Sequence, residues 1–152
     1  TRASTFYRSR EIEKVFIKNP RFSVCLDSSV FDHTYQQKLP PYNLVKEGTF
    51  DGFISFLIRN VFDEKFITFE EAVKKLSTNA AKSYKLEGLG SLKPGYSADI
   101  VLLDVPNLKI MSDNLEPRRS PSGVEYVFVN GKKVVVKGKH TGAKAGKVLK
   151  KI

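Results

Sequence analysis

The sequence predicts an α/β chain in which helices come first and β-strands come last, and three observations lead to this fold class. Residues 9–27 show a helical pattern, a tight turn and a short apolar strand that ends at an acidic residue, Asp27. Two more helical patterns follow at residues 49–63 and 68–82. The pattern then changes to short strands, including a hairpin at residues 124–137. In α/β folds functional side chains gather at the carboxyl ends of strands, so Asp27 is the first candidate for a functional site.

The first unit joins a helix at residues 9–18 to a strand at residues 22–27. Ser9 is a suitable N-cap, and apolar side chains recur behind it at helical spacing: Ile12, Val15 and Phe16. The Asn19-Pro20 pair predicts the end of this helix, because the residue before a proline disfavours helical backbone angles.

An irregular stretch follows at residues 28–48, where Pro40-Pro41 excludes regular structure. Loops of this length often carry functional residues. Asp32 and His33 lie within it and are candidate ligands, although a polar loop residue is the simpler interpretation of each. His140, placed among lysines near the C-terminus, is expected to be exposed.

Two helices are expected next. The pattern at residues 49–63 is apolar on most sides, with Thr49 as a cap, so this helix should be packed between other elements. The second helix, at residues 68–82, opens with Thr68 and Glu71 at the spacing of a capping box, in which each side chain bonds the other residue's backbone N–H.

The strands follow. Ile100 to Leu103 is an unbroken apolar run, which predicts a strand buried on both faces. Asn130-Gly131 separates two apolar runs and predicts a type I′ hairpin, in which Val129 faces Lys132 and Val127 faces Val134. Both faces of this hairpin are largely apolar, so both should be covered.

Composition narrows the function classes. The chain has 152 residues, of which 41% are hydrophobic and 28% charged, as in globular domains. No apolar run approaches the ~18 residues of a membrane span, and the N-terminal residues lack the apolar core of a signal peptide. The single cysteine, Cys25, excludes an intrachain disulfide and indicates a reducing compartment, which we take to be the cytoplasm. A small buried side chain is the simpler role for Cys25 than a nucleophile.

The net charge of +10 admits an anionic partner. The excess lies late in the chain, in eight lysines: Lys132, Lys133, Lys137, Lys139, Lys144, Lys147, Lys150 and Lys151. No nucleic-acid-binding motif accompanies them, so a solvated basic face is the simpler interpretation and nucleic acid is not an expected partner.

Several segments together resemble the amidohydrolase superfamily. Residues 68–82 resemble its last barrel helix, residues 88–104 its return into a small β-domain, and residues 129–132 its late hairpin. Residues 121–131 (PSGVEYVFVNG) and 138–149 (GKHTGAKAGKVL), with Gly48-Thr49-Phe50, narrow the resemblance to the N-acyl-D-amino-acid deacylases, or D-aminoacylases.

This resemblance implies a C-terminal piece of a TIM-type β/α barrel, followed by part of a small β-sandwich. Residues 1–88 would hold the last barrel strand and its flanking helices, and residues 89–152 the β-domain segment. The parent enzyme would use zinc to hydrolyse the amide bond of an N-acyl amino acid. With two histidines and one cysteine, the chain alone is expected to bind no catalytic metal and to be inactive.

By the same resemblance Asp27 is the one catalytic position carried over. In the family this aspartate follows the eighth strand, contacts the metal, and takes a proton from the metal-bound water before giving it to the leaving amine. The family usually has Gly-Ser-Asp-Gly here, whereas this chain has Cys25-Leu26-Asp27-Ser28.

Two alternatives stay open beside the deacylase hypothesis. One is a non-catalytic, degenerate amidohydrolase module that binds an anionic partner through its lysine-rich end. The other is a fragment of a hydantoinase-like cyclic amidase. In every case we expect either a homo-oligomer or a missing N-terminal barrel to cover the apolar surface that seven absent strands would otherwise bury.

Overall fold

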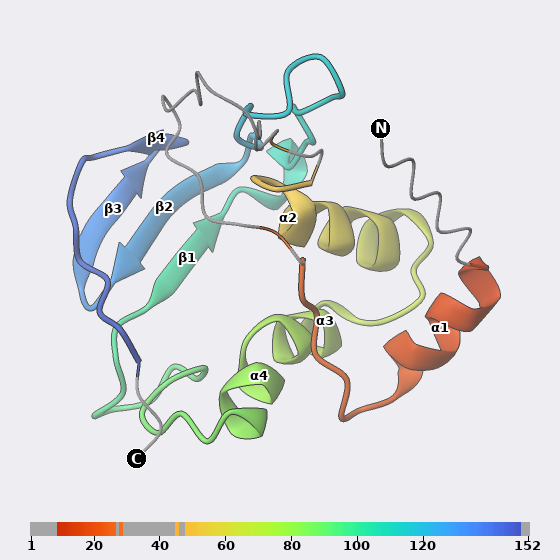
Figure 1. The fold of residues 1–152 in the computed structure, drawn as a ribbon, viewed down its shortest axis with the longest axis horizontal. Coiled ribbons are helices and arrows are strands. Elements are labelled where there is room, and N and C mark those ends of the chain that lie inside the picture. Colours follow the sequence, from red (N-terminus) through yellow and green to blue (C-terminus); the bar gives the residue numbers. More distant parts are fainter. Residues whose placement is uncertain (1–8, 27, 29–44, 46–47, 150–152) are drawn as a thin grey trace, which may run out of the picture.

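The structure is a computed structural model that describes residues 9–26, 28, 45 and 48–149. Its helices are α1 (Arg10–Lys18), α2 (Gly52–Leu57), the π-helix η1 (Ile58–Asp63), α3 (Phe69–Leu76), α4 (Thr78–Ser83) and the short 3-10 turn η2 (Val105–Asn107). Its strands are β1 (Ile100–Leu103), β2 (Val124–Val129), β3 (Lys132–Val136) and β4 (Lys139–His140). Figure 1 shows the sheet at one end of the molecule and α1 at the other, with α2, α3 and α4 between them. No helix in the described part of the chain is long and apolar enough to cross a bilayer.

The four strands form one antiparallel sheet in the order β1-β2-β3-β4. The predicted hairpin is present: Asn130 and Gly131 both have positive φ, 49° and 75°, and Val129 pairs with Lys132 as expected. The predicted pairing of Val127 with Val134 is wrong, because a β-bulge shifts the register and Val127 pairs with Val135.

Thr141, after β4, bonds to two carbonyls at the bulge. The backbone N–H of Thr141 donates to the carbonyl of Val134 at 2.9 Å, and the Thr141 hydroxyl donates to the carbonyl of Lys133 at 3.0 Å. The chain after β4 therefore satisfies the carbonyls at the bulge, while the Val134 side chain is 8% exposed.

The prediction that the run Ile100 to Leu103 is buried on both faces is also wrong. Val101 is 55% exposed and Leu102 44% exposed; since successive side chains of a strand point to opposite faces, the described elements leave both faces of β1 partly uncovered. Leu103 alone packs against the helical core. The continuous apolar run predicted the strand correctly, but it did not predict how far other elements cover the two faces of the strand.

The helix predicted at residues 49–63 is present as α2 followed by η1, but it begins at Gly52 with Asp51 at the N-cap position, so the prediction of Thr49 as its cap is wrong. Its last turn widens, so that the N–H of Glu64 donates to the carbonyl of Arg59, five residues earlier, at 3.0 Å. The carbonyl of Asn60 accepts from the N–H groups of Phe66 and Ile67. These bonds turn the chain sharply toward α3.

The helix predicted at residues 68–82 is two helices, α3 and α4. The capping box is confirmed: the Thr68 hydroxyl accepts from the Glu71 N–H at 3.2 Å, and the Glu71 carboxylate accepts from the Thr68 N–H at 2.8 Å. The break falls at Ser77, with φ −135° and ψ −74°. The hydroxyl of Thr78 then donates to the carbonyl of Gly90 at 2.6 Å, which ties α4 to the following loop.

The strand predicted at residues 22–27 is not found over 22–26, the part of it that the structure describes. A strand needs a neighbouring strand to bond, and none of the described strands pairs with this segment. One backbone bond, from the Val24 N–H to the carbonyl of Lys75 at 3.2 Å, attaches it to α3 instead.

The core lies among the helices. Its buried members come from α1, α2, α3 and the turn before α3: Ile17, Leu57, Ile67 and Ala72. Partly buried side chains from α2, η1 and α3 surround them, and Leu103 of β1 contributes from the sheet. The helical region and the sheet therefore share one apolar cluster at the end of β1.

Candidate functional site

The structure does not bring the sequence-predicted site residues together. Asp27, Asp32 and His33 lie outside the described residues. His140 lies on β4, where its Nδ1 accepts from the N–H of Gly142 at 3.0 Å, and it is exposed as expected. Cys25 is exposed, which corrects the interpretation of this residue as a small buried side chain.

The two chain neighbours of Asp27 are both held at the start of α2. The Ser28 hydroxyl donates to the hydroxyl oxygen of Thr49 at 2.9 Å. On the other side, the Leu26 side chain lies so close to Gly52 that a Cβ there would stand 2.7 Å from Leu26 Cδ2. Gly52 is a position that sequence reasoning missed, since a glycine at the start of a helix gives no signal for a close approach from another segment.

The segment before Asp27 is anchored by α3 and α4. The ammonium group of Lys75 donates to the carbonyl of Asn19 at 2.7 Å, and its side chain is buried, which lowers the pKa of the amine. The amide of Asn79 donates to the carbonyls of Pro20 at 2.8 Å and Phe22 at 3.0 Å. From the sequence, Asn79 could be recognised only as a poor helix former inside a helical pattern, and its bonds to the earlier segment could not be predicted.

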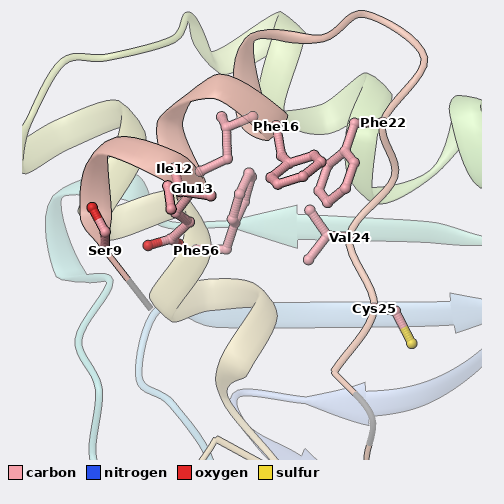
Figure 2. A pocket seen from close by; sticks show the side chains of 9 residues that line it. Ser9, Ile12, Glu13, Phe16, Phe22, Val24, Cys25 and Phe56 are labelled. Carbon is pink, nitrogen blue, oxygen red and sulfur yellow. The ribbon is translucent and has the colours of Figure 1, made fainter. Parts of the chain in front are cut away.

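A hollow of about 520 Å³ opens between α1, the segment at residues 22–25 and α2. Figure 2 shows Ile12, Phe16, Phe22, Val24 and Phe56 gathered around it. Ser9, Glu13, Ile17 and Cys25 complete its lining. The surface is largely apolar, and its carboxylate, Glu13, is already paired with Arg10 at 2.8 Å. This lining suits an apolar side chain better than a charged substrate.

A cluster of charges holds α1 against η1. The carboxylate of Glu64 lies within 3.2 Å of Arg10, Lys14 and Arg59. Hydrogen bonds from Arg10 and Lys14 are the main reason that the pKa of Glu64 falls to about 2. Burial alone would lower the pKa of Arg10, but the bonds to Glu64 and Glu13 outweigh it and raise that pKa.

A buried polar pair joins the helices to the segment after β1. The Ser112 hydroxyl donates to Asp51 Oδ2 at 2.5 Å, and the two residues are 8% and 2% exposed. Asp51 directly precedes α2. Sequence reasoning missed this pair, because nothing in the pattern of either segment indicates that they meet.

The described residues do not fit a metal centre. Among them no group of three or more histidine, cysteine, aspartate or glutamate side chains lies close enough to hold an ion. The geometry is that of a scaffold: hydrogen bonds hold Ser28 and the segment before it, and an apolar hollow opens beside residues 22–25.

Comparison with known proteins finds relatives of this chain. A model of the amidohydrolase family matches residues 44–135. The N-acyl-D-aspartate deacylase of Alcaligenes xylosoxydans xylosoxydans is 34% identical over 103 residues, 67% of this chain and 20% of that protein. The D-aminoacylase of the same organism is 32% identical over 102 residues, again 67% of this chain and 20% of that protein. A dihydroorotase of Endomicrobium trichonymphae is 29% identical over 83 residues, 53% of this chain and 20% of that protein.

Solved structures agree. A D-aminoacylase that defines a novel subset of amidohydrolases superimposes with a TM-score of 0.60 at 30% identity, covering 63% of this chain and 20% of that one. A D-aminoacylase studied for the role of its binuclear metal center matches equally well, with a TM-score of 0.60 at 30% identity over the same shares of the two chains. The chain thus spans about a fifth of the length of the relatives it matches.

Proposed function

The chain belongs to the amidohydrolase family, and from this premise we propose that it is the C-terminal part of a metal-dependent amidohydrolase of the D-aminoacylase type. The observation that carries the proposal is the agreement of two comparisons. The deacylases are matched by sequence over two thirds of the chain, and a D-aminoacylase is matched by backbone geometry over 63% of it.

The proposed reaction of the parent is hydrolysis of the amide bond of an N-acyl amino acid. The names of the two Alcaligenes relatives support this substrate class. The proposed layout is a terminal barrel segment at residues 1–88 and a β-domain segment at residues 89–152. The change from helices to strands between Ser83 and Ile100 agrees with this division. We propose a cytoplasmic location, because this chain carries one cysteine, Cys25, and therefore no intrachain disulfide.

Asp27 is the proposed acid–base residue of the parent. Its support within the described residues is indirect: Ser28 is bonded to Thr49, and Leu26 packs on Gly52. Both chain neighbours of Asp27 are thus held by contacts, and a general base needs a defined position. The metal ligands would come from the part of the enzyme outside this chain, so no catalytic step is assigned to the described residues.

A graft tests this proposal. Residues 22–152 would replace the corresponding end of the Alcaligenes D-aminoacylase, and zinc-dependent release of amino acid from an N-acetyl-D-amino acid would be measured. We expect activity that Asp27→Asn lowers by about 100-fold or more, the usual range for a general acid–base residue. Asp63→Asn, at an exposed aspartate at the end of η1, is the matched control and should leave the rate unchanged.

Two results would contradict the proposal. One is an active graft in which Asp27→Asn has no effect, which removes Asp27 from the chemistry. The other is zinc-dependent deacylation by the purified chain alone, which would show that the chain is active without any further part of an enzyme.

The match to a dihydroorotase, a relative outside the deacylases, favours the hydantoinase-like alternative. Adding a hydantoin to the same assay separates the two. Ring opening of the hydantoin without cleavage of the N-acetyl amino acid would favour the cyclic amidase.

A further inference from the structure

The turn between β2 and β3 carries Asn130-Gly131, the one asparagine–glycine pair in the sequence. Both residues are exposed to solvent. An asparagine before a glycine is chemically labile, because the backbone nitrogen of the glycine can attack the side-chain carbonyl carbon of the asparagine. The glycine has no side chain to hinder the ring that forms. The pair is therefore a candidate site of spontaneous deamidation.

Deamidation consumes water and needs no other reactant. The Gly131 nitrogen loses its proton to solvent and forms a bond to Asn130 Cγ. The bond from Cγ to Nδ2 then breaks, and Nδ2 takes up a proton and leaves as ammonia. Water opens the resulting five-membered succinimide at one of its two carbonyls. Opening at Cγ gives aspartate, and opening at the backbone carbonyl gives isoaspartate, in which the main chain runs through the former side chain.

The segment before β1 restrains the attacking nitrogen. The Gly131 N–H donates to the carbonyl of Ala98 at 3.0 Å, and the Asn130 N–H donates to Asp99 Oδ1 at 2.7 Å. Attack requires the Gly131 nitrogen to shed its proton and to turn toward Asn130 Cγ. The bond to Ala98 must therefore break before the ring can close.

The side-chain amide of Asn130 is held at both ends. Its Oδ1 accepts from the Ser97 hydroxyl at 2.9 Å, and its Nδ2 donates to the carbonyl of Ala145 at 2.8 Å. Cγ is thereby fixed between the segment before β1 and the chain after β4. Ring closure needs Cγ to rotate onto the next backbone nitrogen, so these two bonds also oppose the reaction. The folded chain then reacts only through local opening of the turn.

The bond to Ala145 also holds the end of the chain. Among the described residues it is the one hydrogen bond that joins residues 144–149 to the rest of the molecule. Val148 in this stretch is 86% exposed. Figure 1 shows the chain after β4, in dark blue, running back along the sheet toward the start of β1. Deamidation replaces the donor Nδ2 by a carboxylate oxygen, which repels the carbonyl of Ala145 and the nearby carboxylate of Asp99.

We propose that Asn130 is a site of spontaneous deamidation that the folded turn suppresses, and that its conversion to aspartate or isoaspartate frees residues 144–149. The change is irreversible, because ammonia is lost. Every opening of the turn long enough for reaction thus leaves a permanent mark on the chain. This inference goes beyond the proposed function and does not depend on it.

Peptide mass spectrometry of the 152-residue chain measures the reaction. The chain is kept at mildly alkaline pH, once folded in buffer and once unfolded in urea. We expect deamidation at Asn130 to be at least about tenfold slower in the folded chain, because four hydrogen bonds must open. In the unfolded chain Asn130 should react faster than Asn114, which is followed by leucine and serves as the internal reference.

Two substitutions test whether these bonds protect Asn130. Ser97→Ala and Asp99→Ala each remove one bond, so each should raise the rate in the folded chain about threefold or more. Ser83→Ala, at an exposed serine at the end of α4, is the matched control and should leave the rate unchanged. Circular dichroism checks that each variant is folded. The same peptides from the graft, which carries residues 22–152, give a second measurement in a second host.

Asn130→Asp reproduces the aspartate product and tests the release of the C-terminal segment. Trypsin cleavage after Lys144 should become at least about threefold faster than in the parent, since proteolysis follows the population of the open segment. Cleavage after Lys85, an exposed lysine beyond α4, is the control and should be unchanged.

Four results would overturn the proposal. Equal rates in the folded and unfolded chain would show that the turn gives no protection, and no deamidation in urea would exclude the site. If Ser97→Ala and Asp99→Ala both leave the folded rate unchanged, the bonds named above do not protect Asn130. Unchanged cleavage after Lys144 in Asn130→Asp would reject release of the segment. None of these results bears on zinc-dependent hydrolysis by the graft, so a failure of the proposed function is recognised separately.

Discussion

Asn60 offers the sharpest test of how the helical region is held together. It is 1% exposed in η1, and its side chain makes two bonds: Oδ1 accepts from Arg10 at 2.7 Å, and Nδ2 donates to the carbonyl of Phe56 at 2.8 Å. Asn60→Ala removes both and leaves a partly buried guanidinium with one acceptor fewer. Since a bond to a charged group contributes about 1.5–3 kcal/mol and a neutral one about 0.5–1.5, the loss should be about 2–4 kcal/mol.

Urea unfolding followed by circular dichroism measures this loss, since the chain has no tryptophan to report fluorescence. With a slope of about 2 kcal/mol per molar urea, the midpoint should fall by about 1–2 M. Asn60→Asp separates the two bonds, because a carboxylate keeps the acceptor for Arg10 but opposes the carbonyl of Phe56. Asn114→Ala, in an exposed loop, is the control.

The reasoning fails if the midpoint of Asn60→Ala lies within about 0.3 M of the parent, which corresponds to less than 1 kcal/mol. Such a result would mean that water replaces the side chain without loss. The π-helical turn would then be stabilised by its backbone bonds, from Glu64 to Arg59 and from Phe66 and Ile67 to Asn60.

Three more predictions follow from the structure. The pKa of Glu64 is about 2 in the folded chain against an ordinary 4.5, so the contribution of Glu64 to stability is present above pH 4.5 and is lost as the pH falls toward about 2. Glu64→Gln should remove this pH dependence of stability. If the stability of the variant falls in parallel with that of the parent across this pH range, the prediction is wrong. Gly123 has φ +78°, and a Cβ there would stand 2.8 Å from the nearest atom, so Gly123→Ala should lower the free energy of unfolding by about 2–4 kcal/mol, as measured by thermal or urea unfolding. Gly138 has φ +73° with open space around it, so Gly138→Ala should lower it by only about 1 kcal/mol. Equal losses in the two variants would show that backbone strain alone matters. Asn79→Ala removes the donor to the carbonyls of Pro20 and Phe22, so the rate of amide hydrogen exchange at Val24, measured by NMR, should rise about tenfold. An unchanged exchange rate would show that Lys75 is sufficient to hold the segment.

The elements that the sequence predicted well are those specified by neighbouring residues. The capping box of Thr68 and Glu71 starts α3 where expected, and Asn130-Gly131 makes the hairpin with Val129 opposite Lys132. Both depend on contacts within four residues, which a reader of the sequence can see. The superfamily resemblance was also legible, and the comparisons confirm it.

The candidate site was harder to derive, since its geometry depends on residues far apart in the chain. Lys75 and Asn79 hold a segment more than fifty positions earlier, and Asp51 meets Ser112 sixty-one positions later. No pattern of neighbouring residues predicts such contacts. Asp27 itself stays a prediction, because it lies outside the described residues.

By itself the sequence determined the family, the order of helices and strands, and the turn of the hairpin, because periodicity, caps and turn residues act over a few positions. The tertiary structure alone decided that residues 22–26 form no strand, that β1 is half exposed, that β3 bulges at Val134 and that α1 turns its apolar side outward. Each of these depends on which surface meets which, and a strand or an apolar stripe acquires a partner only from another part of the fold.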